Sequence, residues 1–142
     1  MVIAELYKQL QQYRAVMELN NGCTENTIQL FQQQNNIRLP RTLIELLMCF
    51  DGGELFVPGT IVFGIGESNK VDLKTANSKK KRSVFKIPNN YLVFAKVNYG
   101  DLLCINLNEE HEVIQWDHEL DEEFCKWENL EEWLEDSINN YE

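Results

Sequence analysis

The hydrophobic pattern of the chain changes its period at Asp51-Gly52-Gly53. Before this point, apolar residues recur every three or four positions over residues 2–18, which predicts an amphipathic helix. Thr24 is suited to cap a second helix, and Leu39-Pro40 opens a third helix through LIELLMCF. After the glycines, LFV, IVFGI, YLVFAKV, GDLLCINL and HEVIQW are typical of short β-strands. The pattern therefore favours helices first and a sheet second.

The last part of the chain predicts one more helix. Asn129 followed by Glu132 resembles a capping box, and the apolar face after it consists of Leu130, Trp133, Leu134 and Ile138. Residues 67–86 are polar and basic without a period, so we expect a long loop there with one helical turn at most. We predict a single α+β domain over residues 1–142. Its twisted antiparallel sheet has about 4–6 strands, with N-terminal helices and a C-terminal helix packed around it.

Residues 98–119, NYGDLLCINLNEEHEVIQWDHE, predict a β-hairpin. With Glu109-Glu110 as its turn, Leu103 lies opposite Trp116. This register gathers the large apolar side chains on one face, and a shift by one residue breaks the grouping. The face then consists of Leu103, Ile105, Leu107, Ile114 and Trp116.

The same segment carries both histidines of the chain, His111 and His118. They are an odd number of positions apart, so on a regular strand they face opposite sides at about 23 Å and do not share a metal ion. The register places Asp101 beside His118, which is half of a catalytic triad. No nucleophile motif accompanies it, and Cys104 projects from the other face. We therefore interpret Asp101 and His118 as a hydrogen-bonded clasp of the hairpin, and expect neither catalysis nor a metal or other cofactor.

The net charge of −10 is unevenly distributed. Residues 109–142 contain fourteen acids and one base, Lys126, whereas residues 70–86 contain seven bases and one acid. An acidic surface repels phosphate backbones and anionic lipids and attracts basic proteins. The run Lys79–Arg82 gives a chain of this charge little affinity for nucleic acid. We expect a protein partner, and neither nucleic acid nor a membrane.

Four cysteines are spaced without a C-x-x-C motif, which argues against a zinc knuckle or a thioredoxin-type site. In a reducing compartment they are small buried hydrophobic residues. The chain has no apolar run long enough to span a bilayer, and its first residues do not resemble a signal peptide. The sequence therefore predicts a cytoplasmic protein.

Taken in order, several short motifs resemble the SUKH superfamily, the Smi/Knr-type domain. IRLP at 37–40 leads into LIELLMCFDGG, which is similar to the Leu-Pro, helix and Asp-Gly-Gly element of that family. YLVFAKVNYGDLLCINL is similar to its strand, Gly-Asp turn and strand, and VIQWDHE to its Val-x-x-Trp-x-His segment. The landmark residues of the resemblance are Leu39, Pro40, Gly52, Gly53, Gly100, Asp101, Trp116 and His118.

The resemblance implies helices packed around a twisted antiparallel sheet, and a function in protein binding. Many bacterial single-domain members act as immunity proteins that neutralise a toxin delivered between cells, often a nuclease or deaminase. Other members, especially in fungi, are regulatory scaffolds in cell-wall signalling. The family is not known for enzymatic activity. We expect the partner to meet the acids Asp117, Glu119, Asp121, Glu122 and Glu123. The sequence leaves open the partner's identity, the oligomeric state and the role of Lys79–Arg82.

Overall fold

The computed structural model describes residues 2–108 and 111–141. In this part the chain has an α+β fold with one antiparallel sheet of seven strands, in the order β1-β2-β3-β4-β5-β6-β7. The strands are β1 (Glu18–Leu19), β2 (Gly53–Leu55), β3 (Thr60–Val62), β4 (Tyr91–Lys96), β5 (Leu102–Asn106), β6 (Val113–Asp117) and β7 (Glu122–Trp127). The helices are α1 (Val2–Leu10), the 3-10 helix η1 (Gln11–Val16), α2 (Glu25–Asn35), α3 (Arg41–Cys49), α4 (Leu73–Ala76), α5 (Lys79–Val84) and α6 (Leu130–Tyr141).

The fold class is confirmed, but the strand count of about 4–6 was too low because the two edge strands gave no signal. β1 is two residues long, which is too short to show any period. β7 is exposed at Glu122, Glu123 and Phe124 and nowhere fully buried, so its sequence lacks the alternation of a half-buried strand.

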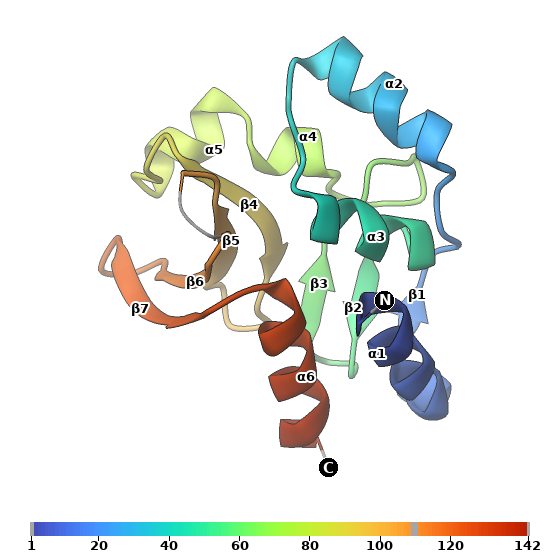
Figure 1. Cartoon of the computed structure of the whole chain (residues 1–142). Coiled ribbons are helices and arrows are strands. Elements are labelled where there is room, and N and C mark those ends of the chain that lie inside the picture. The colour runs from blue at the N-terminus through green and yellow to red at the C-terminus, as the bar shows by residue number, and fades with distance from the viewer. Residues whose placement is uncertain (1, 109–110, 142) are drawn as a thin grey trace.

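Helices cover both faces of the central strands, as Figure 1 shows. On one face α1, α3 and α6 meet one another, and Trp133 of α6 packs edge-on against Phe94 of β4 with ring centroids 5.2 Å apart. On the other face lie α4 and α5, which share a cavity lining with Val93 and Leu102 of the sheet. All five residues of β5 are consequently buried.

The N-terminal region follows the predicted order with one difference. The expected helix over residues 2–18 ends as an α-helix at Leu10, continues as η1 with a kink at Tyr13, and becomes extended at Met17. The chain then pairs with β2 as β1. The predicted cap of α2 is confirmed, because the Thr24 side chain accepts a hydrogen bond from the Thr27 backbone N–H. Pro40 lies directly before the first turn of α3, at the N-cap position, and its side chain makes no capping hydrogen bond.

Residues 67–86 do not form the expected long loop. They contain α4 and α5, and each begins at a capping side chain, Asp72 for α4 and Ser78 for α5. The basic run Lys79–Arg82 therefore lies on a helix. Helices of four and six residues are too short to display a 3.6-residue period, although both caps were visible in the sequence.

β5 and β6 form the predicted hairpin, but the predicted register was wrong by one residue. Trp116 lies opposite Leu102, not Leu103, and Ile114 lies opposite Cys104. The prediction assumed that only one face of the hairpin is buried. Because helices cover both faces, either register buries the apolar side chains, and hydrophobic grouping does not select between them. The expected turn at Glu109-Glu110 lies outside the described residues.

The C-terminal helix agrees closely with its sequence pattern. The Glu132 backbone N–H donates to Asn129 Oδ1 at 2.8 Å, so Asn129 caps α6. The Glu132 carboxylate reaches back to the N–H of Glu128 at 3.0 Å, one residue before the position of a regular capping box. The buried residues of α6 are the four predicted: Leu130, Trp133, Leu134 and Ile138. No helix in the described part of the chain is long and apolar enough to cross a membrane.

Candidate functional site

Asp101 and His118 meet at the open end of the β5–β6 hairpin, and the predicted clasp is confirmed. His118 Nδ1 lies 2.6 Å from Asp101 Oδ1, and the His118 backbone N–H donates to the same oxygen at 3.1 Å. Gln115 Nε2 donates to the other carboxylate oxygen at 2.9 Å. Asp101 is buried, and three donors satisfy its carboxylate.

These contacts shift the pKa values of both clasp residues. Burial alone would raise the pKa of Asp101, but the hydrogen bonds from Gln115 and His118 outweigh it and hold the pKa below the ordinary 3.8. The hydrogen bond to Asp101 raises the pKa of His118 above 6.5, and the nearby charges of Glu119 and Asp117 act in the same direction. The clasp is therefore an ion pair in mildly acidic solution.

Two further landmarks, Gly100 and Trp116, belong to the same cluster. Gly100 has φ +112°, and a Cβ built on it would lie 2.9 Å from Nε2 of the His118 ring. Only glycine leaves room for the imidazole at this point. Trp116 donates its indole N–H to the backbone carbonyl of Phe85 at 2.8 Å, which ties the hairpin to the end of α5. These landmarks hold the hairpin in place.

A second structural cluster forms where α3 ends. Asp51 is buried, and its carboxylate accepts the backbone N–H groups of Ile65 at 2.7 Å and Gly66 at 2.8 Å. This carboxylate fixes the chain after β3. Sequence reasoning named Asp51 only as part of the Asp-Gly-Gly motif and assigned its carboxylate no contact, although an acid directly after an apolar helix was a signal for such a role.

The landmarks that flank α3 are also structural. Leu39 and Pro40 are buried at its start. Gly53 has φ +129°, and a Cβ there would lie 2.7 Å from the Cα of Leu19 in β1, so glycine allows the two strands to approach. Gly52 also has a positive φ, 80°. The landmark residues thus hold the scaffold together.

The chemistry of the clasp does not favour catalysis or metal binding. Asp101, Asp117 and His118 each offer one ligand atom within 4.8 Å of the others. However, the Asp101 carboxylate already accepts three hydrogen bonds, and Asp117 Oδ1 accepts the backbone N–H groups of Glu119 and Leu120. A metal ion would compete with these hydrogen bonds for the same two carboxylates. Burial raises the pKa of Cys104 to about 12, so this thiol stays protonated and is a poor nucleophile.

The five acids expected to meet a partner follow one another along the end of β6, the following turn and the start of β7; we call residues 117–124 the acidic hairpin. The carboxylates of Glu119, Glu122 and Glu123 are exposed, whereas Asp117 shapes the turn through its two hydrogen bonds. The same segment carries two large exposed apolar side chains: Leu120, between Glu119 and Asp121, is 67% exposed, and Phe124, directly after Glu123, is 66% exposed. The sequence prediction did not include them.

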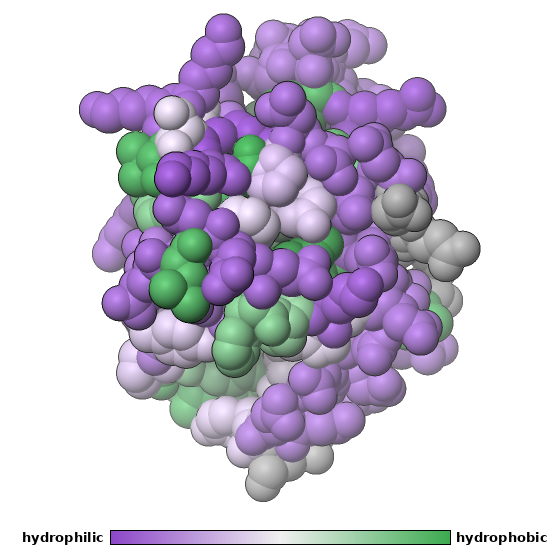
Figure 2. All heavy atoms as spheres, turned by 90° about the vertical axis from the view of Figure 1, so that its left-hand side faces the viewer, coloured by the Kyte–Doolittle hydropathy of each residue, from purple (hydrophilic) through white to green (hydrophobic). Residues whose placement is uncertain are grey.

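Figure 2 shows the side of the molecule that carries β7. It is largely hydrophilic, with separate hydrophobic side chains emerging between the polar ones. The acidic hairpin thus combines negative charge with two accessible apolar side chains.

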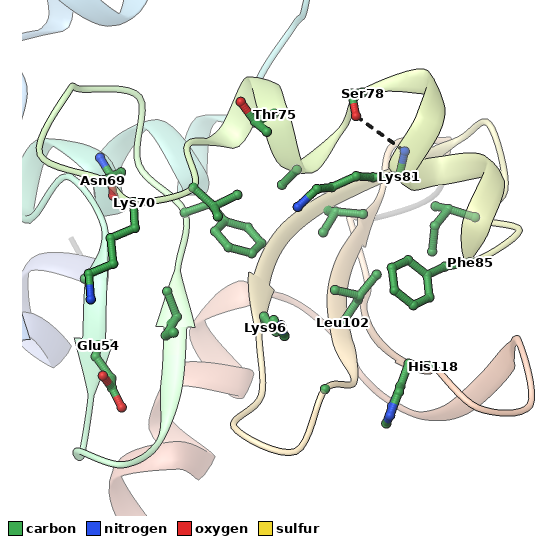
Figure 3. Close-up of a pocket in the computed structure, with 18 of the residues that line it drawn as sticks. Glu54, Asn69, Lys70, Thr75, Ser78, Lys81, Phe85, Lys96, Leu102 and His118 are labelled. Carbon is green, nitrogen blue, oxygen red and sulfur yellow. Dashed lines mark hydrogen bonds between the residues drawn. The ribbon is translucent and has the colours of Figure 1, made fainter.

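A groove of about 1070 Å³ lies on the face of the sheet that α4 and α5 partly cover. Its apolar lining includes Ile61, Phe63, Val84, Phe85, Ile87, Val93 and Leu102, and its basic lining consists of Lys70, Lys80, Lys81 and Lys96. We call it the lysine groove. In Figure 3, Lys81 extends from α5 across the strands, and His118 lies at one end. Sequence reasoning missed this groove because its lysines come from a loop, a helix and a strand.

Comparison with known proteins identifies a family. The family model for the SMI1 / KNR4 family (SUKH-1) matches residues 22–136. None of the curated proteins compared with the chain matches it. The matched region contains every landmark residue described above and extends from the turn before α2 into α6. The chain therefore belongs to the SMI1 / KNR4 family, as its sequence motifs indicated.

Proposed function

We propose that this member of the SMI1 / KNR4 family is a binding protein without catalytic activity, and that it is an immunity protein that neutralises a toxin domain. The whole chain, residues 1–142, acts as one domain in the cytoplasm. The landmark residues support the scaffold, and the acidic hairpin provides the contacts with the toxin. A nuclease toxin suits this surface, because a protein that binds phosphate backbones presents a basic cleft.

The observation that carries the proposal is the free negative charge of the acidic hairpin. Glu119, Glu122 and Glu123 are exposed, and none of them forms an ion pair with a described residue. The nearby Lys126 pairs with Glu112, at 3.3 Å, and not with these acids. Their charge is therefore available to lysines and arginines of a partner. Such complementary charge accelerates association and favours partners with a basic surface.

Asp117 and Asp121 have a different role in the same surface. Asp117 holds the turn through its hydrogen bonds, and Asp121 has a positive φ of 54° at the position before β7. These two aspartates orient the hairpin, while the three glutamates supply the charge that reaches outward. We propose all five as partner-binding residues, with Glu122 and Glu123 as the direct contacts.

A regulatory scaffold of the cell-wall signalling type is the second candidate. One observation favours it: the acidic hairpin and the lysine groove are two surfaces of opposite charge, and a scaffold holds two partners at once. A scaffold would capture several proteins of its own cell, whereas an immunity protein binds one toxin.

Co-expression with the product of a neighbouring toxin-like gene tests the proposal. We expect the intact chain to restore growth and to co-purify with the toxin domain. The double variant Glu122→Lys/Glu123→Lys should weaken the complex about ten- to a hundredfold, because two attractive contacts become repulsive at the interface.

The control is Glu5→Lys, which reverses one exposed charge on α1, far from β7 in Figure 1. It should bind and protect like the unaltered chain. Absence of both a complex and growth rescue would refute the immunity function. Equal weakening by Glu5→Lys and by the double variant would refute the acidic hairpin as the binding surface.

A further inference from the structure

The lysine groove and the acidic hairpin have complementary chemistry. The groove has an apolar floor with ammonium groups around it, and the hairpin has two exposed apolar side chains with carboxylates around them. We propose that the acidic hairpin of one copy of this protein binds in the lysine groove of a second copy, and that the chain forms a two-fold symmetric dimer in this way. The inference goes beyond the proposed function and does not depend on it.

The charges of the groove are free to bind such a segment. Lys70, Lys80, Lys81 and Lys96 are all exposed, and none forms an ion pair within residues 2–108 and 111–141. The groove also contains two acids, Glu18 and Glu54, from β1 and β2. Figure 3 shows Glu54 at the end of the groove away from His118 and α5. Excess positive charge is therefore concentrated at the α5 end, and we place the hairpin there.

The apolar contacts also match at the α5 end. Val84 of α5 is 63% exposed, and the half-buried Phe85 and the buried Leu102 belong to the same lining, where Figure 3 shows them next to each other. Leu120 and Phe124 of the partner's hairpin would pack against this apolar area, and both surfaces would become buried. Burying two large side chains removes apolar surface from water on both copies, which supplies affinity that screened surface charges alone do not.

The position of the hairpin allows both copies to bind each other at once. His118 lines the groove and is also the first residue of the turn between β6 and β7, so the hairpin begins at the rim of the groove. A two-fold axis near this rim would bring each hairpin over the partner's groove. Such an interface is closed, and it forms a dimer instead of a filament.

A small anionic ligand fits these observations less well. Sites for small molecules usually have ~300–1,000 Å³ and a few polar groups fixed by packing. The groove lies slightly above that range, and its positive charges are the ends of exposed lysine side chains. A polypeptide segment with several carboxylates and apolar anchors makes fuller use of this surface.

Sedimentation equilibrium of the full chain, from low micromolar to submillimolar concentration, tests the proposal. We expect a monomer–dimer equilibrium. Lys80→Glu/Lys81→Glu should raise the dissociation constant at least about tenfold, and so should Glu122→Lys/Glu123→Lys. A chain that combines all four reversals should return to within about threefold of the unaltered protein, because each reversed pair is attractive again.

The control is Lys8→Glu, which changes an exposed lysine of α1 by the same charge as one groove reversal. It should leave the equilibrium unchanged. Circular dichroism of every variant establishes that it is folded. A monomer at all concentrations would overturn the proposal. A dimer that is insensitive to Lys80→Glu/Lys81→Glu would also overturn it, since that result indicates a different interface, for example pairing of β7 edges.

Discussion

Gly100→Ala tests whether the His118 ring sets the need for glycine in the hairpin clasp. Two separate costs arise at this position. The first is the backbone: φ +112° is unfavourable for any residue with a Cβ, and holding alanine there costs about 1–3 kcal/mol. The second is steric, because the new Cβ would lie 2.9 to 3.1 Å from three atoms of the imidazole.

The steric cost depends on which interactions the His118 ring loses when the new Cβ displaces it. Displacing it breaks the hydrogen bond between His118 Nδ1 and Asp101, which is buried and cannot regain a water partner in full. Loss of a hydrogen bond to a charged group costs about 1.5–3 kcal/mol. Together the two costs predict that Gly100→Ala lowers the free energy of unfolding by about 2.5–6 kcal/mol, which is a large part of the stability of a domain this size.

A double-mutant cycle with His118→Ala separates the two costs. Urea unfolding, followed by fluorescence of the three tryptophans, gives the free energy for the parent, both single variants and the double variant. In the His118→Ala background the ring is absent, so Gly100→Ala should cost only the backbone part, about 1–3 kcal/mol. If Gly100→Ala costs the same in both backgrounds, the ring does not explain the glycine and the reasoning is refuted.

Three further predictions concern stability. His118→Gln should destabilise the protein more at pH 5.5 than at pH 8.5 in thermal unfolding. The pKa of His118 is raised in the folded state, so protonated His118 stabilises the fold below pH 6.5, and this contribution is lost as pH rises through the folded pKa. The pKa of Asp101 is lowered, so its contribution is lost only below about pH 3.8. A penalty that is independent of pH would contradict the ion pair. Asp51→Asn should cost about 2–3 kcal/mol in urea unfolding, because a buried acceptor of two N–H groups becomes partly a donor; a cost below about 0.5 kcal/mol would contradict this role. Asn129→Ala should cost about 1 kcal/mol by loss of the α6 cap, and Asn129→Asp should restore it.

Local side-chain chemistry in the sequence was sufficient to predict where α2 and α6 begin. Thr24 and Asn129 form the hydrogen bonds expected of capping residues, and the four buried positions of α6 are those with helical spacing. Such signals depend on residues within about one turn of each other, so the sequence alone reveals them. The pairing of Asp101 with His118 was also predictable, because both lie just beyond the ends of a short hairpin.

Features that depend on the face of the sheet covered by α4 and α5 could not be predicted from such local signals. The register of β5 and β6 was misread because α4 and α5 bury a face that was expected to be open. Those helices were themselves missed because each is too short for a period. Missing α4 and α5 therefore caused the wrong register, and for the same reason the lysine groove that α5 borders was not predicted.

The fold distributes the basic residues over the surface in a way that a charge count along the chain does not reveal. The seven bases of residues 70–86 do not form one patch: Lys70, Lys80 and Lys81 line the groove, while Arg82 turns to Asn77 and the carbonyl of Pro88. Lys96 joins the groove from β4, outside the basic segment. Because the acidic hairpin begins at the rim of this groove, the two charged surfaces are neighbours.

A basic toxin and a second copy of the chain would then compete for the same glutamates, so a dimer would have to dissociate before the toxin binds. Adding the toxin domain to the dimer should release complexes with one copy of each protein.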